Sequence, residues 1–204
     1  MMSFFSKNRD ELEALGISPD RLPPGQYHTK RFPVLQAGST PDVDLPTWDF
    51  VVDGLVSEPK RWTWDDISAL AVDSMTADIH CVTKWSKFDT EWTGIPVRRI
   101  WDMIDPAPDA RFVMVNAYHG FTANLPLEDF LADTSMFATA FGGEPLTLDH
   151  GYPMRLVVPH LYFWKSVKWV RGFTVTADDA PGFWERNGYH MYGDPFREQR
   201  YWGD

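Results

Sequence analysis

Residues 150–159 read HGYPMRLVVP, and shortly after them residues 166–176 read SVKWVRGFTVT. Both segments are rich in β-branched and other apolar side chains, which favour extended backbone. We therefore expect two strands, at residues 154–158 and 166–176, with no helical pattern between them.

The rest of the chain shows the same preference for strands. Alternating or apolar runs predict further strands at residues 48–54, 74–83, 111–115 and 136–141. Short helices are expected after Thr63, whose hydroxyl can cap an acidic first turn, and at Pro96 and Pro126, which suit the start of a helix. Strands outnumber helices and do not alternate with them regularly. The pattern predicts an α+β fold, a single domain with mixed β-sheets, rather than a doubly wound parallel sheet.

The composition is that of an ordinary globular domain. The chain has 204 residues, of which 44% are hydrophobic and 24% charged, and this length suits one domain. Its 29 acidic and 19 basic residues give a net charge of -10, which argues against a nucleic-acid-binding protein with a basic surface throughout. Aromatic residues reach 15%, with 10 tryptophans, and such side chains fill large cores or line pockets.

The cysteine content and the apolar segments indicate the compartment. The chain has 1 cysteine and can form no intramolecular disulfide, which fits a reducing environment. The longest uncharged stretch, residues 112–127, is too short and too polar to cross a bilayer, and the N-terminus has no long apolar segment. We therefore expect a cytoplasmic protein without a membrane span.

The cysteine is the first candidate for chemistry, because no GxGxxG, phosphate-loop, HExxH, CxxC or GxSxG motif occurs. Cys81 stands beside three potential cations, His80, Lys84 and Lys87. Nearby positive charge lowers the pKa of a thiol, and a thiolate binds soft or high-valent metals. The alternative is a buried cysteine that acts as a small hydrophobic side chain.

A second candidate is Arg155, which stands inside an apolar strand. A largely buried guanidinium needs an anion, and a phosphate suits it because the Arg fork can bind two oxygens at once. The alternative partner is a carboxylate of the protein itself. In the next expected strand, a period of two places Ser166, Lys168 and Val170 on one face, and a hydroxyl beside an ammonium can also bind phosphate. An edge strand that carries Lys to prevent aggregation is the alternative there.

At these residues the chain resembles the molybdopterin-binding domain of the sulfite oxidase family. The resemblance is strongest to the small bacterial branch of sulfite-oxidase-like and methionine-sulfoxide-reductase-like catalytic subunits, and it runs from about Arg31 to the C-terminus. It is carried by residues 80–86 (HCVTKWS), 150–155 (HGYPMR) and 164–169 (WKSVKW), and more loosely by 182–190 (GFWERNGYH).

The resemblance implies a molybdenum cofactor, Mo-molybdopterin, and a role for each matched residue. Cys81 matches the thiolate that ligates molybdenum and is the expected catalytic residue. His150 and Arg155 match residues that hold the phosphate side of the pterin. Three further positions match the segment that wraps the cofactor tail: Ser166, Val167 and Lys168. Asn116 and the segment 30–33 are weaker candidates for cofactor contact.

The resemblance also shows departures from animal sulfite oxidases, which carry a haem domain before this one and a dimerisation domain after it. We divide the chain into an N-terminal extension, residues 1–30, and a molybdopterin-binding oxidoreductase domain, residues 31–204. We therefore expect that this chain carries no haem, that it is a monomer, and that it passes electrons to a separate electron-transfer protein. The family's substrate-binding Arg cluster is not reproduced, because Lys84, Trp85 and Lys87 stand in its place.

The expected activity is transfer of an oxygen atom to or from a small oxyanion or sulfoxide-type substrate, with two electrons passing to the redox partner. Lys84, Lys87 and His119 are candidates to steer the substrate, and Trp85 and Trp164 either line the pocket or belong to the core. Two alternatives remain open. One is a hydrolase or transferase in which Cys81 is the nucleophile, with a base among His119, His150 and His160. The other is a cofactor-binding module without catalysis.

Overall fold

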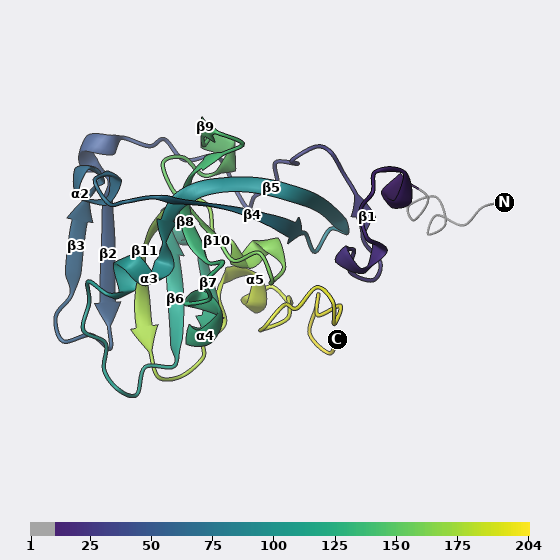
Figure 1. Cartoon of the computed structure of the whole chain (residues 1–204). Coiled ribbons are helices and arrows are strands. Elements are labelled where there is room, and N and C mark those ends of the chain that lie inside the picture. Colours follow the sequence, from purple (N-terminus) through teal and green to yellow (C-terminus); the bar gives the residue numbers. More distant parts are fainter. Residues whose placement is uncertain (1–10) are drawn as a thin grey trace.

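The computed structural model describes residues 11–204, which form two β-sheets packed together with few helices (Figure 1). The six strands of the first sheet are β1 (Tyr27–His28), β4 (Asp73–His80), β5 (Trp85–Pro96), β8 (Met136–Phe141), β9 (Glu144–Pro145) and β10 (Arg155–Val157). The five strands of the second sheet are, in spatial order, β3 (Lys60–Thr63), β2 (Asp49–Gly54), β11 (Val170–Thr176), β6 (Phe112–Ala117) and β7 (Thr122–Pro126). The pairs β1–β5 and β2–β11 are parallel, whereas the other pairs are antiparallel. The predicted α+β fold with mixed sheets is confirmed.

The helices are short, and three of them lie where the sequence predicts them: α2 (Trp64–Ser68), α3 (Val97–Trp101) and α4 (Leu127–Phe130). A further helix in the tail, α5 (Phe183–Arg186), was not predicted. Thr63 and Asp66 form a capping box at α2, in which each side chain accepts from the backbone N–H of the other. Pro96 and Pro126 directly precede α3 and α4. Within residues 11–204, no helix combines the length and the apolar character that crossing a membrane requires.

Short 3₁₀ turns connect several of these elements. They are η1 (Pro19–Arg21), η2 (Leu45–Thr47), η3 (Tyr118–Gly120), η4 (Leu148–His150) and η5 (Phe163–Lys165).

The strand expected at 166–176 is wrong in its first part, since β11 begins only at Val170. Trp169 has a left-handed φ of 53°, which interrupts extended backbone. The period-two grouping of Ser166 with Lys168 is wrong for the same reason, although both residues do reach one pocket.

Two groups of apolar side chains stabilise this architecture. The larger group fills the space between the sheets, and Phe50, Phe137 and Phe173 are all 0% exposed there. Burying each such side chain stabilises the fold by about 1.5–3 kcal/mol. The second group surrounds Cys81 and includes Trp85 and Trp164, which are only 3% and 8% exposed. The pocket described below opens among the aromatic side chains of this second group.

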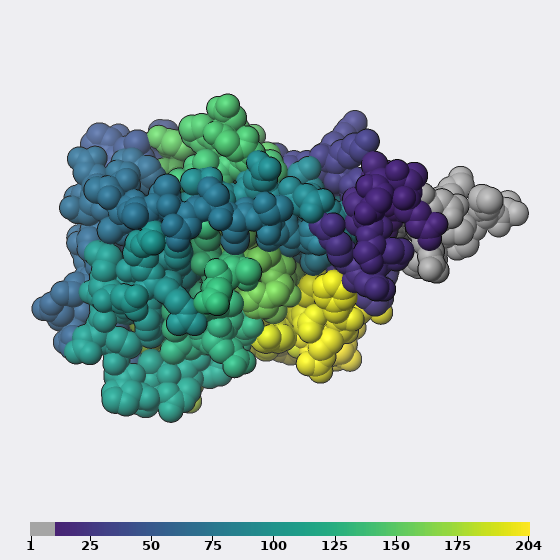
Figure 2. Space-filling view, viewed as in Figure 1, coloured from purple at the N-terminus to yellow at the C-terminus, as the bar shows by residue number. Residues whose placement is uncertain are grey.

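The two terminal segments meet at one end of the molecule, as the purple and yellow surfaces of Figure 2 show. Arg21 forms an ion pair with Asp78 of β4, with Nη2 and Oδ1 2.7 Å apart, and β1 adds to the edge of β5. The guanidinium of Arg200 donates to the carbonyl of Pro24 over 3.0 Å. The N-terminal and C-terminal segments therefore support each other next to the Cys81 loop.

Candidate cofactor-binding site

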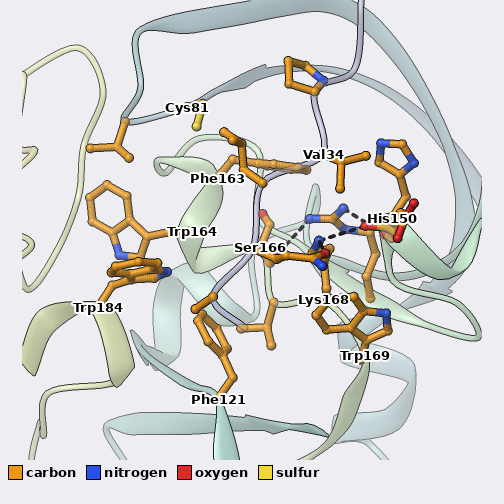
Figure 3. A pocket seen from close by; sticks show the side chains of 18 of the residues that line it. Val34, Cys81, Phe121, His150, Phe163, Trp164, Ser166, Lys168, Trp169 and Trp184 are labelled. Carbon is orange, nitrogen blue, oxygen red and sulfur yellow. Dashed lines mark hydrogen bonds between the residues drawn. The ribbon is translucent and has the colours of Figure 1, made fainter. Parts of the chain in front are cut away.

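A pocket of about 300 Å³ brings together the six residues that the sequence singled out. Its lining contains Cys81, His150, Arg155, Ser166, Val167 and Lys168. Figure 3 shows Cys81 on one side, near Trp164 and Trp184, and His150 with Lys168 on the other. The pocket therefore has a sulfur end and a cationic end.

Cys81 lies in the tight loop that joins β4 to β5. Its backbone N–H donates to the carbonyl of Trp85 over 2.8 Å, and its carbonyl accepts from the N–H of Lys84 over 2.9 Å. The side chain is 8% exposed, and the hydroxyl of Thr83 lies 3.2 Å from Sγ. Burial raises the pKa of the Cys81 thiol, and the contact with Thr83 opposes this shift. The loop presents the sulfur to the pocket in a fixed position.

The expected effect of neighbouring cations on the thiol pKa is not found. Burial lowers the pKa of His80 to about 4, so its ring is neutral at pH 7 and lies 2.9 Å from the hydroxyl of Ser86. The ammonium of Lys87 donates to the carbonyl of Lys30, and Lys84 is exposed. Neither lysine lines the pocket, so adjacency in sequence does not place a cation on Cys81. A thiolate at this position is favoured by a bound metal ion rather than by these side chains.

Arg155 is a buried cation without an acidic partner among residues 11–204. It is 2% exposed, and its guanidinium donates to the carbonyls of His150 and Ser166 over 3.0 and 2.8 Å. Its Cζ atom lies 4.4 Å from the ring centroid of Phe163. Burial lowers the pKa of Arg155 to about 9, so the group still carries its charge at pH 7. The carboxylate alternative is wrong, and the charge is left for an anion in the pocket.

Lys168 adds a second cation to this end of the pocket. Its ammonium donates to the side chain of Gln36 over 2.9 Å and to the carbonyl of Asp149 over 2.8 Å. Burial, and after it the charge of Arg155, lowers the pKa of Lys168 to about 8. Two cations that disfavour each other and share one pocket create a strong preference for a bound anion such as a phosphate.

The other predicted residues shape the wall between the two ends. The ring of His150 stacks on Phe32, with centroids 4.2 Å apart, and burial lowers its pKa. The hydroxyl of Ser166 accepts from the N–H of Val158 over 2.9 Å. Val167 is 1% exposed, and its carbonyl accepts from the N–H of Leu156. These contacts fix the backbone of residues 166–168 along the pocket.

Three of the five described non-glycine residues with left-handed φ lie at or beside the pocket, the other two being Asp89 and Glu198. Lys84, His119 and Trp169 have left-handed φ values of 75°, 58° and 53°. Side chains other than glycine rarely adopt this region, and such residues cluster at functional sites. His119 and Trp169 line the pocket, and Lys84 belongs to the Cys81 loop.

The positions of the remaining predicted residues show which of them lie at the pocket and which do not. Trp85, Trp164 and His119 line the pocket, whereas Asn116 lies outside its lining and bonds to Thr174. His160 pairs with Asp129 at 2.8 Å, also outside the lining. In the described part of the chain the hydrogen-bond partner of the Cys81 sulfur is Thr83 and not a histidine. The geometry gives no support to a cysteine nucleophile with a histidine base.

Sequence reasoning missed part of the lining. The missed residues are Val34, Leu35, Gln36, Ala37, Tyr118, Phe121, Asp149, Phe183, Trp184 and Tyr189, among others. The sequence signal for Phe183, Trp184 and Tyr189 is the aromatic segment 182–190, which matches the family only loosely. Nothing in the sequence predicts that residues 34–37 line the same pocket as Cys81, which follows them by more than 40 residues.

The residues present fit a cofactor that bears a metal and a phosphate. The described side chains offer no group of three or more His, Cys, Asp or Glu that could hold a metal by themselves. Cys81 could therefore supply one ligand, and a metal at this position would need further ligands from outside the described side chains, such as those of a bound organic group. At the other end, the charge of Arg155, which has no acidic partner among the described residues, and that of Lys168, which Asp149 offsets only in part, suit the phosphate of such a group.

A pocket with a thiol at one end and two cations at the other suits a domain that binds an anionic metal cofactor. Residues 37–184 match the family described as "Oxidoreductase molybdopterin binding domain", and the chain belongs to this family. The sulfite-oxidase-type resemblance drawn from the three motifs is confirmed at this level.

Curated relatives carry the same domain in proteins of different length. "Uncharacterized oxidoreductase YuiH" of Bacillus subtilis (strain 168) is 46% identical over 98% of this chain and 100% of its own length. "Putative protein-methionine-sulfoxide reductase subunit YedZ1" of Azospira oryzae is 29% identical over 74% of this chain and 58% of its own length. The methionine-sulfoxide reductase catalytic subunit MsrP of Pseudomonas syringae pv. tomato is 23% identical, over 79% and 52%. The chain thus spans a little more than half of these last two proteins.

A solved structure shares the fold. The sulfane dehydrogenase SoxCD from Paracoccus pantotrophus matches with a TM-score of 0.64 and 21% identity, over 73% of this chain and 42% of that chain. This likeness confirms the predicted fold type of the sulfite oxidase family, with its mixed sheets and few helices.

Proposed function

We propose that the chain is the catalytic unit of a molybdopterin-dependent enzyme that transfers an oxygen atom between a neutral sulfoxide-type substrate and its sulfide, and exchanges two electrons with a separate electron-transfer protein. The observation that carries the choice of substrate is the sulfur end of the pocket. Its walls are aromatic, with Trp164, Trp184 and Tyr189 beside Cys81, and the lysines of the Cys81 loop do not reach the lining.

The absence of a cation at this end separates the two substrate classes expected from the sequence. An oxyanion such as sulfite needs positive groups at the reacting end. Lys168 lies at the opposite end of the pocket (Figure 3), and the guanidinium of Arg155 donates to the carbonyl of His150 at that same end. A sulfoxide with apolar substituents gains free energy from aromatic burial and needs no counter-charge. The names of the Azospira and Pseudomonas relatives, a putative protein-methionine-sulfoxide reductase subunit and a protein-methionine-sulfoxide reductase catalytic subunit, support the same choice.

When bound, the cofactor would supply a metal able to exchange an oxygen atom and two electrons with the substrate. The chain's own residues hold and orient the reactants. Cys81 would ligate the metal through Sγ, and Arg155 with Lys168 would bind the phosphate. The buried position of Cys81, at 8% exposed, and the aromatic walls limit the access of water to the reacting end. Sulfoxide reduction consumes two electrons and two protons and releases the sulfide and water.

The test is turnover by the full chain produced in a host that makes the cofactor. Molybdenum and pterin are measured first, and then reduction of dimethyl sulfoxide and of methyl phenyl sulfoxide with reduced benzyl viologen as the electron donor. Sulfite oxidation with ferricyanide is measured in parallel. Sulfoxide reduction by molybdenum-loaded protein is expected. Loaded protein that turns over sulfite alone, or protein that contains no pterin, would overturn the proposal.

A further inference from the structure

A buried ion pair lies directly behind the aromatic end of the pocket. The side chains of Lys165 and Glu185 are both 0% exposed, and Nζ lies 2.7 Å from Oε1. Neither residue lines the pocket, and the proposed chemistry uses neither of them. Removing two charges from water costs free energy that their attraction offsets only with good geometry, so such a pair alone is weak support for stability.

The pair joins three segments that are far apart in the sequence. Lys165 belongs to η5, and its ammonium also donates to the carbonyl of Asn124 in β7 over 2.9 Å. The same ammonium donates to the carbonyl of Met191 in the C-terminal tail over 2.7 Å. Glu185 stands in α5, at the beginning of that tail. The C-terminal tail is thereby fixed to the second sheet through one ammonium group.

The carboxylate of Glu185 reaches one further side chain, and that side chain lines the pocket. Its Oε1 atom accepts from the indole N–H of Trp164 over 2.8 Å. The ring of Trp164 stacks on Tyr162, with centroids 5.3 Å apart, and contacts the edge of Tyr189 at 5.0 Å. Gly193 closes the remaining side, because a Cβ there would come within 2.8 Å of Cζ2 of Trp164. The indole is therefore held in one orientation.

We propose that Glu185 is a positioning residue: its carboxylate, paired with Lys165, fixes the indole of Trp164 and so sets the width of the pocket beside Cys81. Trp184 belongs to the same wall, since it is the neighbour of Glu185 in sequence and stacks on Tyr189 with centroids 4.8 Å apart. The inference rests on the proposed function for its consequence, because a fixed wall selects which sulfoxides reach the sulfur end. The geometry itself is independent of the substrate.

The first readout needs no cofactor and no substrate. Cys81 is the single cysteine, so alkylation of the full chain by iodoacetamide, followed by mass spectrometry, reports access to the sulfur end of the pocket. The variant Trp164→Phe keeps an aromatic ring and the ion pair but removes the indole N–H. Protein made in a host without the cofactor is expected to be alkylated roughly tenfold faster in this variant, the size of one lost hydrogen bond to a charged group. The matched control is Trp62→Phe in β3, outside the pocket lining, which leaves the rate unchanged.

A double-mutant cycle separates positioning from a merely structural role. Glu185→Gln alone should also accelerate alkylation, and it should add nothing in the Trp164→Phe background, because Glu185 acts through Trp164. Additive effects would overturn the proposal. If Glu185→Gln does not fold, the test rests on Trp164→Phe alone. An alkylation rate of Cys81 in Trp164→Phe equal to that in the Trp62→Phe control would then overturn the proposal.

The loaded enzyme gives the second readout. At equal molybdenum content, Trp164→Phe should change the ratio of kcat/KM for methyl phenyl sulfoxide to that for dimethyl sulfoxide, chiefly through KM, whereas a loss of stability would lower both alike. An unchanged ratio of kcat/KM together with faster alkylation would show that Glu185 limits access to the Cys81 sulfur without affecting substrate selectivity, and would overturn its role in selectivity. If the wild-type enzyme reduces no sulfoxide, the proposed function fails, while the alkylation experiment still tests the positioning.

Discussion

The side-chain amide of Gln26 donates a hydrogen bond to the backbone carbonyl of Cys81 over 3.1 Å, although 55 residues separate them in the sequence. Two backbone bonds run beside it, from the N–H of Tyr27 to the carbonyl of Lys84 and from the N–H of Thr29 to the carbonyl of Ser86. Gln26 is 1% exposed and lies upstream of the residues that match the family. The N-terminal segment therefore helps to hold the loop that presents the candidate metal ligand.

Replacing Gln26 by Ala should loosen this loop. The carbonyl of Cys81 would lose one of its two donors and keep the N–H of Lys84, which is expected to lower the free energy of unfolding by about 0.5–1.5 kcal/mol. Alkylation of Cys81 in cofactor-free protein should accelerate as well. Urea unfolding and mass spectrometry check both effects. Asn187→Ala, at an exposed position of the tail, is the control, and equal behaviour of the two variants would show that the contact does not hold the loop.

The parts of the fold that could be predicted are those governed by local pattern. Thr63 caps α2 through contacts only three residues apart, and β10 is recognisable from a run of apolar residues. The second half of the expected strand at 166–176 is also present as β11. These elements depend on neighbours in the sequence, so one sequence is enough to predict them.

The remainder depends on contacts between distant segments. The direction of the Trp169 backbone is decided by its place in the pocket, where its indole donates to the carbonyl of Leu148. The neutral state of His80 follows from burial, and a list of adjacent charges does not reveal burial. The family motifs carry six of the residues that line the pocket, whereas Trp184 and Tyr189 reach it only through the path of the C-terminal tail.

The variant Cys81→Ser tests the proposed metal ligand. Serine has nearly the same shape, but its hydroxyl is a poor ligand because it does not ionise near neutral pH. The fold should therefore persist, with a change in the free energy of unfolding of at most about 1 kcal/mol, while retained molybdenum and turnover fall by at least roughly tenfold. Elemental analysis and circular dichroism measure the two effects. Thr83→Val, which keeps the thiol, is the control and should retain molybdenum. Full activity in Cys81→Ser would exclude the ligand role.

Substitutions at Arg155 test the cationic end. Arg155→Met removes a buried charge, and we expect loss of about 2–5 kcal/mol of cofactor binding free energy, the range for one partner of a buried charge-assisted pair. Arg155→Lys keeps the charge but cannot span the carbonyls of both His150 and Ser166, so its pterin content should lie between those of wild type and Arg155→Met. Pterin fluorescence after oxidation measures this series. Arg186→Met, on the exposed tail, serves as the control. Wild-type pterin content in Arg155→Met would contradict the assignment.

The titration of Lys168 predicts how the cofactor-free chain responds to pH. Its pKa falls from the ordinary value of 10.5 to about 8 in the folded chain, first through burial and then through the charge of Arg155. Between these two values the unfolded chain binds a proton that the folded chain has lost, so the contribution of Lys168 to the free energy of unfolding rises with pH. Below about 8 both states carry the proton and the contribution is constant.

The difference between wild type and Lys168→Met removes the tyrosines that titrate in the same range, and it contains the titration of Lys168 together with its coupling to Arg155. Urea unfolding at several pH values should show the wild-type free energy of unfolding rising relative to that of the variant from about pH 8 to about pH 10. A flat difference would show that the ammonium is not desolvated in the pocket. A bound phosphate reverses the sign, because it raises the pKa of Lys168 and binds best to the charged form. Pterin retention by the wild type should therefore be complete at neutral pH and decline as the pH rises through the pKa of Lys168 in the complex. Retention by Lys168→Met should be lower and independent of pH over that range.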